Sequence, residues 1–149
     1  MSSALVDAFV SRWHAWLGLP HKPASWYRER LAEELIEEAE AEGFVARLSE
    51  TADVHYTITR ARSNGHDIAA TPRPLLPYLY MVAKFTSRCG FYRAAAWLSG
   101  GSAHGAPVLE VVNPSKEAKR RAVALRHGID PDRFQKVCRI LLLVWPLFP

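Results

Sequence analysis

The sequence predicts an all-α fold, a bundle of about five to six helices. Over most of the chain, apolar residues recur every three or four positions, the spacing of one helix face. Glycine and proline divide the 149 residues into segments of helical length. Only residues 107–112, which contain three valines, favour a short strand, and a lone strand has no partner. With 49% hydrophobic residues at this length, we expect a single domain over residues 1–149.

The first three helices are predicted from apolar spacing and from the breaks at Gly18, Gly43 and Gly65. The third should run from about residue 47 to residue 63 and turn back on the second. The two helices would then form one hairpin over about residues 24–64. The side chains expected in the core of these helices are Leu5, Phe9, Trp13 and Trp16, then Leu31, Leu35, Ile36 and Ala39, then Val54, Ile58 and Ala61.

Basic helices are expected over about residues 75–145. The first is predicted at 75–98, with Pro77 tolerated in its first turn. Ser115 is the predicted N-cap of a helix over 116–127. Asp130 and Pro131 form the expected cap and first-turn pair of a last helix, which should run through Val144 and end before Pro146.

Composition excludes several classes of protein. The amino-terminal apolar residues are interrupted by charge and do not form a secretory signal. The apolar run at 140–148 is much shorter than the roughly 20 residues that cross a bilayer. Cys89 and Cys138 have neither disulfide-framework nor zinc-ligand spacing. We therefore expect a cytoplasmic protein that does not span a membrane.

Charge divides the chain into two halves. The formal net charge is +4, but residues 1–70 carry seven basic and eleven acidic side chains, whereas residues 71–149 carry twelve and four. The basic half by itself would suit nucleic acid, and the acidic half opposes such a partner electrostatically. A nucleic-acid-binding domain is therefore the least favoured of three functional classes.

The acidic half contains a pattern that suits metal binding. Glu34 and Glu37 lie three residues apart, as do Glu50 and Asp53, so each pair projects from one helix face. An antiparallel hairpin around Gly43 would bring the four carboxylates together. Converging anions repel unless a cation lies between them, and oxygen ligands without cysteine indicate Mg²⁺ or Mn²⁺. The alternative is a solvated, glutamate-rich helix face.

The spacing Glu-Glu-x-x-Glu, twelve residues, Glu-x-x-Asp, carried by Glu33, Glu34, Glu37, Glu50 and Asp53, resembles the metal signature of the all-α nucleoside triphosphate pyrophosphohydrolases, the MazG-like and dUTPase-like superfamily. The resemblance covers about residues 26–65. It implies a four-helix MazG-like core and hydrolysis of a nucleoside triphosphate to the monophosphate and pyrophosphate. It makes Glu34, Glu37, Glu50 and Asp53 the metal ligands, and Glu33 and Glu37 the catalytic carboxylates, with Glu33 orienting water.

Phosphate and base would need further residues. Basic side chains near the start of the 116–127 helix and on the preceding helix are the candidates for phosphate: Lys116, Lys119, Arg120 and Lys84. Trp13 and Trp26 are the candidates for stacking on a base. The alternatives are a basic solvated face and an aromatic core.

Besides nucleic-acid binding, we consider two functional hypotheses. The first is a Mg²⁺-dependent nucleotide pyrophosphohydrolase acting on a nucleotide or another phosphorylated small molecule. The second keeps the fold as a helical binding or regulatory module, or as an enzyme on another diphosphate. Family members are commonly dimers or tetramers, and the apolar last helix would suit a homo-oligomer interface.

Overall fold

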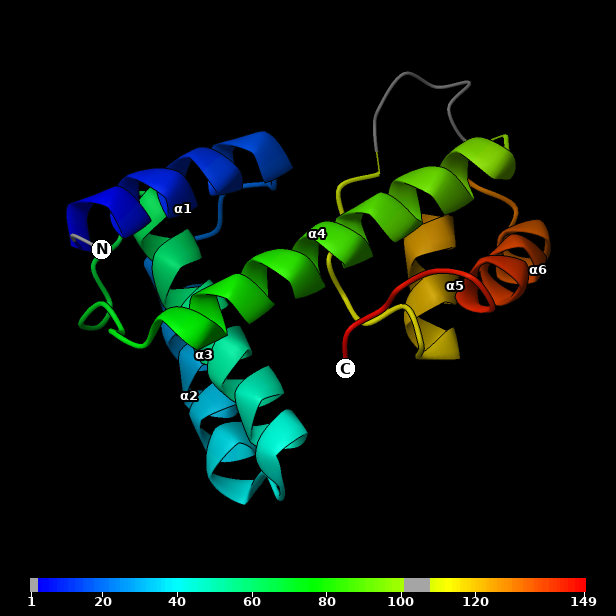
Figure 1. Ribbon diagram of the computed structural model, residues 1–149. Helices are drawn as coiled ribbons and strands as arrows, with labels where there is room; N and C mark the ends of the chain where they lie inside the picture. The colour runs from blue at the N-terminus through cyan, green and yellow to red at the C-terminus, as the bar shows by residue number, and fades with distance from the viewer. Residues whose placement is uncertain (1–2, 101–107) are drawn as a thin grey trace. The chain divides into compact units, whose positions relative to one another are not determined.

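The computed structural model describes residues 3–100 and 108–149 (Figure 1). In these two ranges the chain forms six helices and no strand, which confirms the all-α prediction. The helices are α1 (Ser3–Leu17), α2 (Ala24–Glu40), α3 (Phe44–Ser63), α4 (Leu75–Leu98), α5 (Glu117–Arg126) and α6 (Pro131–Leu142). No helix in the described part of the chain is long and apolar enough to cross a membrane.

The helices belong to two compact units, with the boundary inside α4. Unit 1 comprises Met1–Ala83 with Pro149, and unit 2 comprises Lys84–Phe148. In unit 1, α2 and α3 form an antiparallel hairpin and α1 packs on α3 (Figure 1). In unit 2, α5 packs on α6. That residues 1–149 form a single domain stays a prediction.

The hairpin turns at Gly43, whose φ of +82° is a left-handed conformation that L residues rarely adopt. The carbonyl of Gly43 accepts a hydrogen bond from the N–H of Arg47 at 3.1 Å, so the first turn of α3 is already closed there. The helix therefore begins at Phe44, three residues before the predicted start.

The starts of α5 and α6 differ in how well they were predicted. Asp130 caps α6 by accepting a hydrogen bond from the N–H of Arg133 at 2.6 Å, as expected. Ser115 as the cap of α5 was wrong, because the side chain of Asn113 accepts the N–H of Ser115 at 2.9 Å and Lys116 takes the cap position. The last helix ends at Leu142, two residues earlier than predicted.

Replacing Asp130 with alanine is expected to lower the free energy of unfolding by about 1 kcal/mol, because the N–H of Arg133 loses its acceptor. Urea unfolding measures the change. The control is Asp132→Ala, which removes an exposed ion pair with Arg121 and a first-turn carboxylate but no capping hydrogen bond, and it should cost less than about half as much. Equal losses in the two variants would contradict the capping role.

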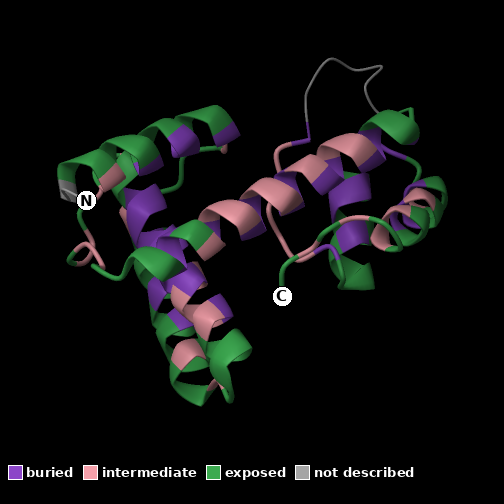
Figure 2. Cartoon of the chain, viewed as in Figure 1, coloured by how far each residue is buried: buried purple, intermediate pink, exposed green. Residues whose placement is uncertain are grey.

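The core of unit 1 uses a different stripe of α1 from the one predicted (Figure 2). Trp13 is buried as expected, but Leu5, Phe9 and Trp16 are all more than half exposed. The buried stripe one position further along consists of Val10, Trp13, His14 and Leu17. Both stripes have helical spacing, and packing against α3 selects the second.

The α2 helix shows a similar difference. Leu31 is buried as predicted, whereas Leu35 and Ile36 are exposed. The buried side of α2 is formed by Tyr27, Leu31 and Glu34. A carboxylate therefore occupies a position on the core face, and this places it toward α3.

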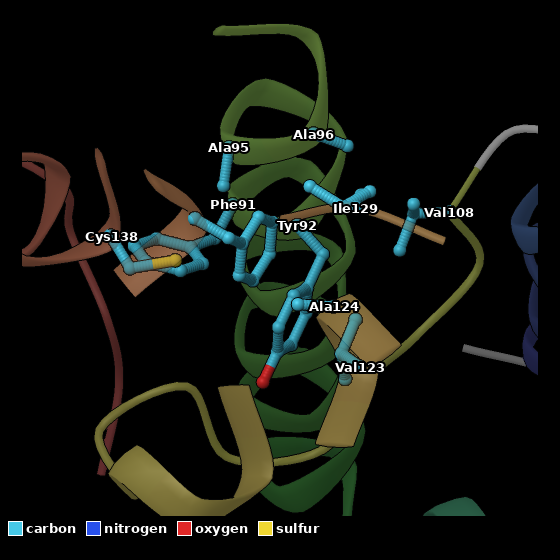
Figure 3. Packing of buried hydrophobic residues seen from close by; sticks show 10 residues of the cluster. Phe91, Tyr92, Ala95, Ala96, Val108, Val123, Ala124, Ile129 and Cys138 are labelled. Atoms are coloured by element: carbon cyan, nitrogen blue, oxygen red, sulfur yellow. The ribbon is translucent and has the colours of Figure 1, made fainter. Parts of the chain in front are cut away.

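Unit 2 has its own apolar core, formed by α4, α5, α6 and the segment at Val108. Phe91 and Tyr92 of α4 lie among Val123 of α5 and Cys138 of α6 (Figure 3). Trp145 packs edge-on against Phe91 and donates its indole N–H to the Ser87 carbonyl at 3.1 Å. The described part of 107–112 is irregular, and Pro107 lies outside the described residues.

Candidate metal centre

Three of the four predicted metal ligands come together in unit 1. Glu34 of α2 and Glu50 and Asp53 of α3 each place one carboxylate oxygen within 4.8 Å of the others. The antiparallel hairpin produces this arrangement, because Glu50 and Asp53 lie one turn apart on the side of α3 that faces α2. We call these three residues the acidic triad.

Glu34 is the most unusual member of the acidic triad because its side chain is almost completely buried, with 2% of the residue exposed. Its Oε1 pairs with Arg30 one turn earlier on α2. Its Oε2 has no hydrogen-bond partner among the described residues. Burial, together with the neighbouring carboxylate of Asp53, raises the pKa of Glu34 from 4.5 to about 7.

The positions flanking the acidic triad fix how α2 and α3 align. Leu31 packs against Val54 and Ile58 in a small apolar cluster. On the other side, the hydroxyl of Thr51 donates to the carboxylate of Glu38 at 2.5 Å. These contacts hold the triad together although its like charges repel.

His55 follows Asp53 by two positions but belongs to a different part of the helix surface. Its Nδ1 donates to the carbonyl of Thr51 at 2.8 Å, and its ring lies edge-on to Tyr78. Burial lowers the pKa of His55. His55 therefore serves as a packed, neutral side chain.

Glu33 and Glu37 are both exposed on α2. Glu33 forms an ion pair with Arg30 at 2.7 Å, so Arg30 contacts both Glu33 and Glu34. Glu37 lies outside the group of three converging oxygens. The catalytic roles of Glu33 and Glu37, and Glu37 as a metal ligand, stay predictions. Sequence reasoning missed Arg30, although its spacing of four from Glu34 is the spacing of helical ion pairs.

The four candidate phosphate ligands all belong to unit 2. Lys116 and Lys119 are exposed, whereas Lys84 is 1% exposed. Arg120 is also buried, and its guanidinium donates to the side chain of Gln135 at 2.7 Å and to the carbonyl of Pro114 at 2.8 Å. Arg120 thus ties α5 to α6 and to the preceding loop. Phosphate binding by these residues stays a prediction.

The two candidate base-stacking residues have different surroundings. Trp13 is buried against His14, with ring centroids 4.7 Å apart, and against Tyr56. Trp26 is 36% exposed, and the guanidinium of Arg60 lies 5.5 Å from its ring centroid. Trp26 therefore presents an accessible aromatic surface beside a cation, whereas Trp13 belongs to the core.

His14 is buried beside Arg60, and its Nε2 lies 2.8 Å from the hydroxyl oxygen of Thr59. Burial lowers the pKa of His14 from 6.5 to about 3, with Arg60 adding to the effect. The unfolded chain therefore takes up a proton that the folded chain excludes, and stability falls as the pH drops from 6.5 toward 3.

Because of this proton, the free energy of unfolding should be about 3 kcal/mol lower at pH 4.5 than at pH 7.5. We expect the stability difference between wild type and His14→Gln to change by about that amount between the two pH values, in favour of the variant at pH 4.5. Urea unfolding at both pH values measures it, and contributions from other titrating groups cancel in the difference. A difference that does not change with pH would show that His14 is protonated in the fold.

No protein-family model, curated protein or solved structure matches the chain. The function is therefore inferred from the residues and their geometry.

Proposed function

We propose that the protein is a divalent-metal-dependent hydrolase of phosphoanhydrides, which converts a nucleoside triphosphate to the monophosphate and pyrophosphate. The observation that carries the proposal is the acidic triad. Three carboxylate oxygens from two helices converge within 4.8 Å, and one of the three residues is buried with an oxygen that no described residue satisfies. Burying a carboxylate costs free energy, so a glutamate-rich surface without a ligand is expected to keep all its carboxylates in solvent.

The donor set suits Mg²⁺ or Mn²⁺. All three groups are hard oxygen donors, and neither cysteine nor histidine belongs to the group. Glu34, Glu50 and Asp53 would hold the cation, and Glu37 on the next turn of α2 is the proposed fourth ligand. When bound, such a cation supplies Lewis-acid chemistry: it lowers the pKa of water and neutralises charge on phosphate oxygens.

The chain's own residues contribute positioning. Arg30 forms ion pairs with both Glu33 and Glu34 and so places a cation beside two neighbouring carboxylates. Glu33, which is exposed on the same turn as Glu34, is the proposed group that orients the attacking water and accepts its proton. Direct attack of water on the α-phosphate requires no covalent intermediate, and hence no nucleophilic serine or cysteine.

The proposed partners are a nucleotide or another phosphorylated small molecule and further copies of the chain. At the carboxyl-terminal end, Ile140, Leu143 and Val144 are each more than half exposed, which supports self-association into a homo-oligomer. Light scattering coupled to gel filtration tests the oligomeric state.

The decisive experiment measures pyrophosphate release from a panel of nucleoside triphosphates with Mg²⁺, with Mn²⁺ and with chelator. Wild type is compared with Glu37→Gln and Asp53→Asn, and with Glu40→Gln as a control on an exposed glutamate of the same helix. Release that needs metal, is lost in the first two variants and persists in the control supports the proposal.

Metal binding without release from any triphosphate would move the assignment to another diphosphate substrate. The absence of metal binding would overturn the proposed function. If a binding partner were then found whose affinity survives Asp53→Lys, the protein would be a helical binding module.

A further inference from the structure

Unit 1 contains a polar cavity that is separate from the acidic triad. It has a volume of about 350 Å³, within the range of small-molecule sites, and lies where the end of α1 and the following loop meet the end of α3. Its lining includes His14, Gly18, His21, Arg60, Ser63 and Asn64, and none of the described residues that line it is acidic.

Arg60 supplies the permanent charge of this cavity. The residue is 9% exposed, and no carboxylate of a described residue forms an ion pair with it. Its Nη2 donates to the carbonyl of Pro20 at 2.8 Å, and its buried Nε has no hydrogen-bond partner within the described residues. A buried guanidinium with an unsatisfied N–H and no counter-ion is costly unless an anion completes it.

The position of the guanidinium is fixed by its surroundings. It lies 5.5 Å from the ring centroid of Trp26 and 5.9 Å from those of Tyr27 and Tyr56. Cation–π contacts of this kind hold the planar group without satisfying its N–H donors. The Pro20 carbonyl that it contacts lies between Leu19 and His21, which both line the cavity.

Three further polar residues line the cavity beside Arg60: Ser63, Asn64 and His21. The hydroxyl of Ser63 is a donor, and the amide of Asn64 has a second N–H besides the one that it donates to the Tyr27 hydroxyl. His14 contributes no positive charge near pH 7, because burial lowers its pKa to about 3. One fixed cation among several neutral donors suits a tetrahedral oxyanion with many acceptor lone pairs.

From these contacts we infer that the cavity around Arg60 binds the phosphate group of a small phosphomonoester. A phosphate ion alone is much smaller than the cavity, so the remaining volume accommodates an organic group such as a sugar. Arg60 lies seven residues beyond Asp53, which is about 10 Å along the helix, so this site is separate from the acidic triad. The inference does not rest on the proposed hydrolase function.

The test is thermal unfolding with inorganic phosphate and with ribose 5-phosphate, in chelator and at constant ionic strength. Near-saturating ligand is expected to raise Tm by about 3–5 °C, with ribose 5-phosphate effective at lower concentration than inorganic phosphate. An equal response to acetate, or no response to either phosphate compound, would overturn the inference.

Two variants locate the site. Ser63→Asp places a carboxylate one turn from Arg60 and should weaken ribose 5-phosphate binding at least tenfold, whereas Ser115→Asp makes the same charge change in unit 2 and should not. Arg60→Met should also abolish the response, and Ser63→Asp keeps the test decisive if that variant does not fold.

The Glu50→Gln variant separates this inference from the proposed function. It removes a member of the acidic triad and should leave the ribose 5-phosphate response unchanged. An unchanged response in Ser63→Asp, or a response lost in Glu50→Gln, would show that the phosphate binds elsewhere.

Discussion

Replacing Glu34 with glutamine is expected to abolish metal-dependent pyrophosphate release and, at the same time, to stabilise the metal-free protein. The loss of activity should be at least about 1,000-fold, equivalent to about 4 kcal/mol, because a carboxylate ligand becomes a neutral amide. Stability should change in the opposite direction, because Glu34 is buried beside Asp53 with one oxygen unsatisfied.

The expected gain in stability depends on pH in a defined way. The pKa of Glu34 is raised from 4.5 to about 7, so its ionised form is penalised in the fold. This penalty is present in full above pH 7 and disappears as the pH falls through 7 toward 4.5. At pH 8 we therefore expect Glu34→Gln to raise the free energy of unfolding by about 2–3 kcal/mol, and at pH 4 to leave it almost unchanged.

Urea unfolding in chelator at pH 8 and pH 4, with and without Mg²⁺, measures these changes. Wild type should gain stability from Mg²⁺ and Glu34→Gln should not. Glu33→Gln is the matched control, because Glu33 is exposed on the same turn of the helix and its removal should barely change stability. A Glu34→Gln variant that is less stable than wild type at pH 8 would show that the Arg30 ion pair outweighs the burial penalty.

Replacing Phe134 with alanine is expected to destabilise unit 2 by about 3–5 kcal/mol. Phe134 is completely buried and stacks on Tyr92, with ring centroids 6.4 Å apart and ring planes within 8° of parallel. Tyr92 in turn contacts Phe91 edge-on. The deletion therefore leaves a cavity at the centre of the aromatic cluster that joins α4 to α6.

The control is Phe44→Ala, the same change at a residue that is 73% exposed at the start of α3. Its cost should stay below about 0.5 kcal/mol. Urea unfolding followed by circular dichroism compares the two variants. Similar losses would mean that unit 2 repacks around the missing ring.

The ends of helices were predicted correctly where a single residue type strongly favours a helix start or stop. The bounds of α4 at Leu75 and Leu98 and the cap at Asp130 follow from residues with one strong local preference. The start of a helix was predicted wrongly where two local signals compete. Asn113 and Ser115 both favour hydrogen bonds to nearby N–H groups, and the side chain of Asn113 takes the N–H of Ser115.

Periodicity predicted that α1 is amphipathic but selected the wrong face. Both the predicted stripe Leu5–Phe9–Trp13–Trp16 and the buried stripe Val10–Trp13–Leu17 satisfy helical spacing, and only tertiary contacts with α3 decide between them. The convergence of Glu34, Glu50 and Asp53 was predicted, because it follows from two pairs of acidic residues spaced three apart and from the turn at Gly43. The same prediction included Glu37, which lies outside the acidic triad. The cavity at Arg60 was not predicted, because it requires the loop after α1 to meet the end of α3, and no local pattern encodes such a meeting.

The tryptophans give each unit an optical probe. Trp13 is buried in unit 1 and Trp145 is half-buried in unit 2, where its N–H is bonded to the Ser87 carbonyl. The chain has five tryptophans. Indole emission shifts to longer wavelength when the ring becomes solvated, so a variant in which Trp13 or Trp145 is the single remaining tryptophan, with the other four replaced by phenylalanine, reports on one unit. Coincident fluorescence transitions of the two single-tryptophan proteins would mean that residues 1–149 unfold as one cooperative domain. Separate transitions would mean that α4, the helix shared by both units, unfolds in two parts during denaturation.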